Sequence, residues 1–303
     1  MSATTATTER PWATAQMPDR DLSFHEVGNT KILTPTQRDT YNREGFCHPF
    51  EAFTGAEVAE TRGYIDHLFE LLRASGENKN YALLGYHTRC RGLYDIVMNP
   101  RILDIVQDIV GPDIICWTSQ VFCKVAYDPK SIPFHQDASY WPLNPARTVS
   151  VWLAIDDADR ENSCLNVIPR THALGQLPWT RVSDDAVLDQ SMDNPLSYGE
   201  PFPIELRAGQ FSLHADMLAH GSAANKSNRR RCGFAIRYCP PSVQPLKRDW
   251  ARNAILCRGS DPSGNWTYSG RPEGDDVGDW PSYWFKKYRE GAKEIVNAGN
   301  IGA

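Results

Sequence analysis

The chain has 303 residues, of which 41% are hydrophobic, 23% charged and 11% aromatic, and it carries a formal net charge of −5. This composition excludes a disordered, collagenous or coiled-coil chain, and a chain of this length can bury a large core. Because the sequence has neither an overall basic charge nor a stretch of about 20 apolar residues, we expect neither nucleic acid nor a membrane as its partner.

The chain is predicted to form a single domain behind a flexible N-terminal arm. The arm covers residues 1–30, and the domain covers residues 31–303. Within the domain, residues 31–112 are predicted to be helical, residues 113–240 to form the β core, and residues 241–303 to cover that core. Helices first and strands afterwards are typical of the α+β class.

Three helices are expected in the first third of the domain. Thr34 as N-cap and Pro35 as the first helical residue predict a helix that ends at Gly45. Apolar residues recur at helical spacing within residues 55–76 and 100–111, which predicts the other two.

From Asp113 onward, short β-branched and aromatic runs replace the helical periodicity. Turn residues separate these runs and few helical patterns lie between them, so they predict an antiparallel sandwich or barrel and not a doubly wound parallel sheet. The runs expected as strands cover residues 113–127, 147–156, 164–169, 202–214 and 231–239.

Most aromatic and cysteine side chains are expected to be buried. The polar segment after residue 248 contains Trp250, Trp266, Trp280 and Trp284, which we expect to pack over the strands. The eight cysteines form no CxxC pair and no Cys/His cluster of the zinc-finger kind, so we expect buried free thiols. Together with the lack of an apolar signal stretch at the N-terminus, this indicates a reducing, cytoplasmic location.

A histidine and a carboxylate stand two residues apart in the run FHQDASYW. In an extended segment, residues i and i+2 project from the same face, so His135 and Asp137 can converge on one point. A third candidate, His220, lies between two expected strands that can bring it back opposite this pair. Two histidines and one carboxylate form the facial triad of non-haem Fe(II) oxygenases, which leaves coordination positions open.

An arginine opens the last expected strand of the core. Strand alternation turns Arg230 and Arg231 to opposite faces, and we expect Arg231 to point into the barrel. A guanidinium inside a barrel needs an anionic partner, because its charge is costly to bury unpaired. A dicarboxylate cosubstrate would supply one, with one end on the metal and the other on Arg231, and with the Ser222 hydroxyl as a second donor.

These motifs resemble the phytanoyl-CoA dioxygenase family of Fe(II)- and 2-oxoglutarate-dependent oxygenases. The resemblance covers most of the chain and is most specific in FHQDASYWPLNPARTVSVWLAIDDADRENSCLNVIPRTH and HGSAANKSNRRRCGFAIRY. It implies a double-stranded β-helix core, of the jelly-roll or cupin-like kind, flanked by N-terminal helices. It places the iron ligands on His135, Asp137 and His220, and the 2-oxoglutarate contacts on Arg231 and Ser222.

Six further residues are weaker candidates. Gln120 and Lys124 lie four apart on one expected strand and hence on one face, where they could reach the cosubstrate or substrate, or simply face solvent. Trp152, in an alternating strand, could form a wall of the cofactor pocket or fill the core.

The other three concern the substrate. Trp141 follows the metal motif, where similar enzymes place an aromatic side chain beside the substrate, and its alternative is a place in the core. Tyr86 and His87, in the turn-like run LLGYHTRCRG, are candidates for the mouth of the site, with a purely structural role as the alternative.

The resemblance implies a dioxygenase that uses Fe(II), 2-oxoglutarate and O2, and converts 2-oxoglutarate to succinate and CO2 while it hydroxylates or otherwise oxidises an unactivated C–H bond. We expect a small or medium-sized metabolite as substrate, as in secondary metabolism; its identity, the type of oxidation and the oligomeric state do not follow from the sequence. Three alternatives stay open: a halogenase on the same scaffold, against which Asp137 argues; a Zn(II) hydrolase, which leaves Arg231 unexplained; and a non-catalytic metal-binding jelly-roll protein.

Overall fold

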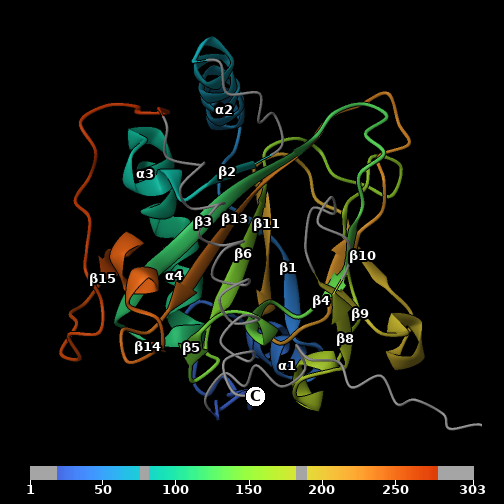
Figure 1. Cartoon of the computed structure of the whole chain (residues 1–303), viewed down its shortest axis with the longest axis vertical. Coiled ribbons are helices and arrows are strands. Elements are labelled where there is room, and N and C mark those ends of the chain that lie inside the picture. Colours follow the sequence, from blue (N-terminus) through green and yellow to red (C-terminus); the bar gives the residue numbers. More distant parts are fainter. Residues whose placement is uncertain (1–18, 76–81, 182–189, 279–303) are drawn as a thin grey trace, which may run out of the picture. The chain divides into compact units, whose positions relative to one another are not determined.

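The structure is a computed structural model, and it describes residues 19–75, 82–181 and 190–278. Asp21–Val277 form one compact unit, to which all the helices and strands of the described residues belong (Figure 1). The other unit combines Met1–Arg20 with Gly278–Ala303, and almost all of its residues lie outside the described ones.

The described part of the predicted N-terminal arm packs against the domain. Residues 1–18 lie outside the described residues, but the carbonyl oxygen of Asp21 accepts a hydrogen bond from the Ala146 N–H at 2.7 Å. The Val27 N–H donates to Oδ1 of Asn42 at 2.8 Å, and the Val27 side chain is buried. These contacts hold the segment from Asp21 onward against the domain.

The three predicted helices are present, and the described residues contain a short fourth α-helix as well. The helices are α1 (Pro35–Glu44), α2 (Ala56–Ala74), α3 (Arg91–Val97) and α4 (Pro100–Val110). The hydroxyl of Thr34 accepts a hydrogen bond from the Gln37 N–H at 3.2 Å, which caps α1 as predicted. The chain leaves α1 at Gly45 with a φ of 83°, a left-handed conformation that favours glycine.

A seven-stranded antiparallel sheet lies at the centre of the described unit (Figure 1). In spatial order it contains β1 (Phe46–Glu51), β11 (Gln210–Ala215), β6 (Val149–Ala154), β13 (Arg231–Cys239), β3 (Ile114–Lys124) and β15 (Ile255–Arg258), and β2 (Ala82–Leu84) also pairs with β3. α4 packs against β3, β6 and β13. The sequence patterns before residue 112 predict only helices, so the prediction is wrong for β1 and β2. These two strands were not predicted because the strands they pair with, β11 and β3, lie far along the chain.

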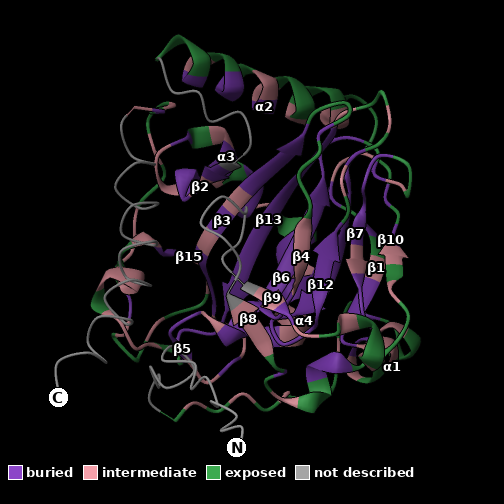
Figure 2. Ribbon diagram, turned by 45° about the vertical axis from the view of Figure 1, so that its right-hand side comes forward, coloured by how far each residue is buried: buried purple, intermediate pink, exposed green. Residues whose placement is uncertain are grey.

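A smaller antiparallel sheet faces the large one. It contains β10 (Phe202–Ile204), β7 (Leu165–Val167), β12 (His220–Ser222) and β4 (Ile132–His135), and two short pairs join β5 (Leu143–Asn144) to β14 (Gln244–Pro245) and β8 (Trp179–Arg181) to β9 (Gln190–Met192). Between the two main sheets, Phe122 and Trp152 of the large one share an apolar core with Leu165 and Val167 of the small one. Figure 2 shows that the strands of the two sheets consist largely of buried residues. The predicted α+β class with a jelly-roll core is confirmed.

The segment after the core packs onto it as far as the structure describes that segment. Trp266 is buried and Trp250 partly buried in a cluster that also contains Trp141. Trp280 and Trp284 lie outside the described residues.

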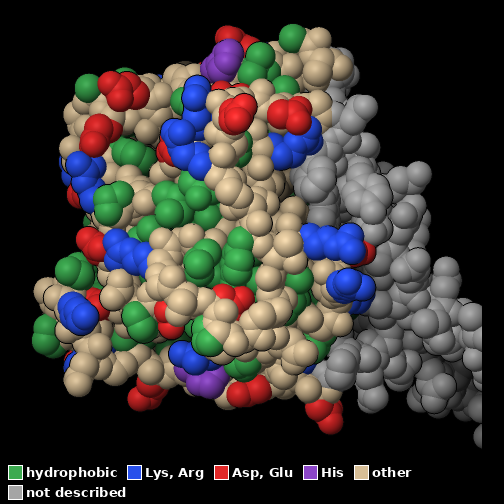
Figure 3. All heavy atoms as spheres, turned by 90° about the vertical axis from the view of Figure 1, so that its left-hand side faces the viewer, with side chains coloured by type: hydrophobic (Ala, Val, Ile, Leu, Met, Phe, Trp, Pro, Cys, Tyr) green, Lys and Arg blue, Asp and Glu red, His purple; other side chains and the backbone are tan. Residues whose placement is uncertain are grey.

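The cysteines, the helices and the surface charges of the described residues can be compared with the expectations from the composition. All eight cysteines are buried and free, as predicted. No helix of the described ranges is long and apolar enough to cross a membrane. On the face in Figure 3, acidic, basic and apolar side chains are interspersed.

Candidate metal centre and anion pocket

The three candidate metal ligands meet at one edge of the smaller sheet. His135 ends β4 and His220 begins β12, and the two are direct partners across these strands. Gln136 is extended, so strand alternation continues through it to Asp137, the first residue of the 3₁₀-helix η2 (Asp137–Ser139). The Gln136 side chain donates to backbone carbonyl groups elsewhere. The predicted i, i+2 pair is therefore present, and His220 joins it.

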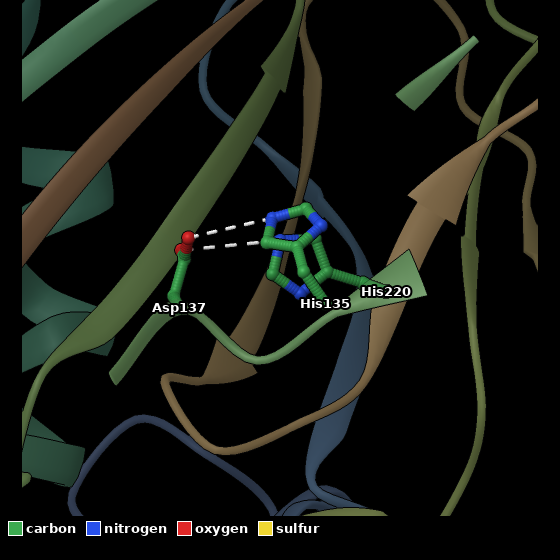
Figure 4. A group of neighbouring side chains, drawn as sticks. All are labelled: His135, Asp137 and His220. Carbon is green, nitrogen blue, oxygen red and sulfur yellow. Dashed lines mark ion pairs between the residues drawn. The ribbon is translucent and has the colours of Figure 1, made fainter. Parts of the chain in front are cut away.

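Figure 4 shows the two imidazole rings facing the Asp137 carboxylate. His135 Nε2 lies 3.6 Å from Asp137 Oδ1, and His220 Nε2 lies 3.9 Å from Oδ2. One ligand atom from each residue lies within 4.8 Å of the other two. Ligands about 2.0–2.2 Å from an ion, at right angles, are about 3 Å apart, so a small inward movement of these side chains would bring them to bonding distance.

The hydrogen bonds of the two histidines fix which nitrogen faces the centre. Nδ1 of His135 lies 2.8 Å from the Pro133 carbonyl oxygen, and Nδ1 of His220 lies 2.9 Å from the Leu218 carbonyl oxygen. Because a carbonyl oxygen only accepts, each Nδ1 carries a proton, and in the neutral ring the lone pair is then on Nε2. Burial, and then nearby His135, hold the pKa of His220 well below its usual value. Neutral imidazole with an oriented Nε2 is the form that binds metals.

Asp137 is held as a carboxylate in spite of its burial. Burial raises its pKa, but the charge of Arg237, with His220 and His135, outweighs burial and holds the pKa well below its usual value. The Tyr140 hydroxyl donates to Oδ1 at 2.7 Å, and Arg237 Nε lies 3.8 Å from Oδ2. The third candidate ligand is therefore anionic and fixed in orientation.

Two buried cations connect the large sheet to the strand that carries His220. Lys124 ends β3 and Arg231 begins β13, and these direct partners are only 0% and 1% exposed. Lys124 Nζ donates to Ser222 Oγ at 2.8 Å. Ser222 lies two residues after His220 on β12 and hence on the same face.

Trp152 lies against this cation pair. The Arg231 guanidinium lies over the Trp152 ring, 5.2 Å from its centre, and Arg231 Nε donates to the Ser163 carbonyl oxygen at 3.0 Å. Gly233 makes room for the ring, because a Cβ at that position would clash with it. The Trp152 Nε1 is buried and makes no hydrogen bond to any described residue, so it can donate one to a bound molecule.

The arginines beside Arg231 face away from the pocket. Arg230 pairs with Asp156, with Nε 2.7 Å from Oδ2. Arg229 is exposed and pairs with Asp159 at 2.7 Å. The prediction from strand alternation, that Arg231 and not Arg230 points into the barrel, is confirmed.

The donor set of this pocket fits a dicarboxylate. Burial, and then the charge of Arg231, lower the pKa of Lys124 to about 7, and Asp128 offsets this only in part. Two cations buried side by side repel each other, so a bound anion would stabilise both. Because Ser222 brings the pair close to the candidate metal ligands, one molecule with two acidic ends would reach both groups. The residues present thus fit iron together with 2-oxoglutarate.

The interior beyond the triad carries further predicted residues. Gln120 is half-buried on the face of β3 that also carries Lys124, as its spacing predicts. Trp141 is buried and lies beneath the guanidinium of Arg237, with 5.2 Å from the guanidinium carbon to the ring centre.

Tyr86 and His87 lie inside the protein. Both belong to the short 3₁₀-helix η1 (Tyr86–Thr88) and are 0% exposed. Nε2 of His87 lies 2.9 Å from the Asn253 carbonyl oxygen, and burial lowers the pKa of His87 to about 4. This placement favours the structural alternative for His87.

Two polar residues near the triad have no counterpart in the sequence-based predictions. The ring of His214 on β11 lies 4.7 Å from that of His220, and neither nitrogen of His214 makes a hydrogen bond to a described residue. Arg237 contacts Asp137 directly. Strand alternation is the signal that could have identified Arg237. Arg237 lies six residues after Arg231 on the same strand, an even number, so both side chains lie on one face.

The sequence matches the family described as phytanoyl-CoA dioxygenase (PhyH) over residues 41–233, which include the three candidate ligands and Arg231. The chain is 26% identical over 156 residues to a probable phytanoyl-CoA dioxygenase of Caenorhabditis elegans, and the alignment covers 48% of this chain and 50% of that protein. The chain thus spans about half the length of such curated relatives.

Solved structures agree with the fold. A non-heme monooxygenase, ThoJ, is similar with a TM-score of 0.68 and 27% identity, and the match covers 86% of this chain and 97% of that chain. CytC3 with Fe(II) and alpha-ketoglutarate is similar with a TM-score of 0.59 and 20% identity, covering 82% of this chain and 98% of that chain. At 20% identity, the second likeness concerns the fold alone.

Proposed function

The chain belongs to the phytanoyl-CoA dioxygenase family, and from this premise we propose that it oxidises an unactivated C–H bond of a small or medium-sized metabolite, by hydroxylation in the first instance. The match to the family model confirms both the family and the non-haem dioxygenase class that the sequence predicts. The predicted cofactors are those of the family, namely iron, 2-oxoglutarate and O2, and the triad fits the metal.

One observation carries the proposal: a buried His, Asp, His cluster lies beside a buried pair of cations. The cluster alone would suit several metals, including zinc. The cation pair also requires an anionic partner. Because Lys124 contacts Ser222, which lies two residues after His220, that anion would bind next to the cluster. The activation of a water molecule by a metal does not require such a pair, whereas the binding of a dicarboxylate cosubstrate does.

Each residue has a distinct part in the proposed complex. His135, Asp137 and His220 hold the iron through two Nε2 atoms and one carboxylate. When bound, the iron supplies the activation of O2 at the expense of 2-oxoglutarate, which becomes succinate and CO2. Arg231 and Ser222 donate to the far carboxylate of 2-oxoglutarate.

The surrounding residues orient the centre and exclude water. His135, Asp137 and His220 are 6%, 2% and 7% exposed, so little solvent reaches them. The Tyr140 hydroxyl holds one oxygen of Asp137, and backbone carbonyl groups hold both imidazoles. A preorganised and dry site favours attack on the bound substrate over side reactions with water.

Asp137 distinguishes an oxygenase from a halogenase on the same scaffold. A halide bound to the metal would need the coordination position that the carboxylate of Asp137 faces. The carboxylate is anionic and fixed by Tyr140, so chloride would not displace it at low cost. We therefore propose oxidation without halogenation.

A retention experiment tests the proposal. The protein is loaded with Fe(II) and 2-oxoglutarate without O2, mixed with a metabolite extract and freed of unbound compounds, and the retained compound is identified by mass spectrometry. Admission of O2 should then give succinate in proportion to a product that differs by an oxidation, such as one added oxygen atom.

Two variants sharpen the result. His220→Ala should form neither succinate nor product, because a ligand is lost, whereas Arg229→Ala should behave as the wild type because that side chain is exposed. Failure of the wild type to form succinate with any retained compound, or a product that carries chlorine when chloride is added, would contradict the proposal.

A further inference from the structure

The larger sheet carries a second buried arginine inside the fold. Arg237 lies six residues after Arg231 on β13, about 20 Å further along the strand, and faces the same interior. It is only 8% exposed. Its partners across the strands are Thr118 on one side and Ser150 on the other, and neither side chain carries charge. The Arg237 guanidinium is therefore a buried cation next to Asp137 of the candidate metal centre.

The described residues satisfy this guanidinium only in part. Arg237 Nε is buried and makes no hydrogen bond to any described residue. Its ion pair with Asp137 spans 3.8 Å, which is longer than a hydrogen bond. The guanidinium also lies over the face of Trp141, a weaker contact. A buried guanidinium usually makes several hydrogen bonds, so this arrangement lacks acceptors.

Asp137 already has other partners. Its Oδ1 accepts from Tyr140 at 2.7 Å, its Oδ2 lies 3.5 Å from the Ser150 hydroxyl, and the carboxylate is the proposed anionic ligand of the iron, which leaves little acceptor capacity for Arg237. The two charges of Fe(II) and the two of 2-oxoglutarate offset each other. Arg231 and Arg237 then face Asp137 as the carboxylate closest to the metal, while Asp128 offsets part of the charge of Lys124. Two guanidinium groups beside one carboxylate favour an anionic substrate over a neutral one.

The frame around Arg237 suits an apolar body attached to that anion. Trp141 stands edge-on to Trp117, with ring centres 4.8 Å apart, and Trp117 in turn packs on Trp250 at 5.4 Å. Tyr140 lies edge-on to Trp141 at 6.1 Å. Aromatic faces of this kind bind hydrocarbon or ring portions of small molecules.

We propose that Arg237 and Trp141 form the substrate subsite, and that the substrate is an organic carboxylate with an apolar or aromatic portion. This rests on the proposed function and adds the chemical class of the substrate. The guanidinium binds the substrate carboxylate, Trp141 packs against its apolar portion, and the C–H bond to be oxidised is thereby aimed at the metal centre.

The alternative is that Arg237 acts only as the counter-charge of Asp137. In that case its removal would change the affinity for the metal and would not change the preference for acids over neutral compounds. The two roles therefore separate in one experiment.

The experiment uses protein loaded with Ni(II), which does not turn over, and saturated with 2-oxoglutarate so that the Arg231 pocket is filled. Ligand-observed NMR gives dissociation constants for benzoate and hexanoate and for the matched neutral compounds, benzamide and hexanamide. We expect at least one acid to bind about tenfold or more tightly than its amide in the wild type. Arg237→Gln should remove this preference and leave the affinity for 2-oxoglutarate within about twofold, and Arg229→Gln should keep both.

The proposal is overturned if no acid binds better than its amide in the wild type, or if Arg237→Gln keeps the preference. A change in Ni(II) affinity alone, with the acid preference intact, would assign Arg237 to Asp137 and also overturn it. Failure of the wild type to bind 2-oxoglutarate would contradict the proposed function instead. The ratio of acid to amide affinity is measured in the same titrations whether or not 2-oxoglutarate binds, so the two failures can be told apart.

Discussion

Replacement of Arg231 by alanine tests the anion pocket at its centre. The change removes a guanidinium that is 1% exposed, lies over Trp152 and is the strand partner of Lys124. A charge-assisted contact to a carboxylate contributes about 1.5–3 kcal/mol, so binding of 2-oxoglutarate should weaken about ten- to a hundredfold.

Lys124 makes this loss depend on pH. Burial and then Arg231 lower the pKa of Lys124 to about 7, so removal of Arg231 raises that pKa towards its usual value. At about pH 6, Lys124 is charged in both proteins and the full loss should appear, towards a hundredfold. At about pH 8.5, Lys124 is largely neutral in the free wild type, and a larger fraction of it is charged in the variant, which offsets part of the loss, so the factor should fall towards tenfold.

Calorimetric titration of 2-oxoglutarate into Ni(II)-loaded protein at both pH values measures the two factors. Arg229→Ala is the matched control, because Arg229 lies nearby in the sequence but pairs with Asp159 at the surface. If Arg229→Ala weakened binding and Arg231→Ala did not, the register of β13 in the site would be refuted. A factor that rose with pH would refute the coupling between Arg231 and Lys124.

Three further outcomes are expected. Binding of 2-oxoglutarate to the wild type should take up a proton above about pH 7, and the affinity for 2-oxoglutarate should fall as pH rises, because the dianion favours protonated Lys124. Calorimetry in two buffers of different ionisation enthalpy measures the proton uptake, and Lys124→Met should abolish it. Gly233→Ala should lower the free energy of unfolding by about 1–3 kcal/mol, because a Cβ would clash with Trp152, and unchanged thermal unfolding would contradict this. Asp137→Gly should abolish succinate formation and lower the affinity for Ni(II), and retained activity would exclude Asp137 as a ligand.

The metal centre could be predicted because strand alternation is a local rule. His135 and Asp137 share a face since Gln136 stays extended, although the strand itself ends at His135 and a 3₁₀-helix begins at Asp137. Arg231 and Arg230 separate for the same reason. Parity within one strand can be read from a sequence without knowledge of the strand's neighbours.

What the sequence could not supply is which strands meet. Lys124 was open to two interpretations, a solvent-facing residue or a pocket residue, because its face depends on Ser222 of a distant strand lying opposite. The pairing of β1 with β11 had the same difficulty, since nothing in the helical region before residue 112 specifies a partner beyond residue 200. Short strands such as β1 also give too few alternating positions to distinguish them from a turn.

The division of the site between the two sheets explains why both kinds of motif were needed. Two of the proposed metal ligands lie on β4 and β12 of the smaller sheet, with Asp137 immediately after β4, whereas Lys124, Arg231 and Arg237 lie on β3 and β13 of the larger one. In the proposed complex, the smaller sheet supplies the metal ligands and the larger one supplies the cations, so a metal-chelating dicarboxylate needs both sheets. The cosubstrate would therefore join the sheets from within, and the interior of the jelly roll has to stay polar at the triad and apolar at Trp152 for that bridge to form.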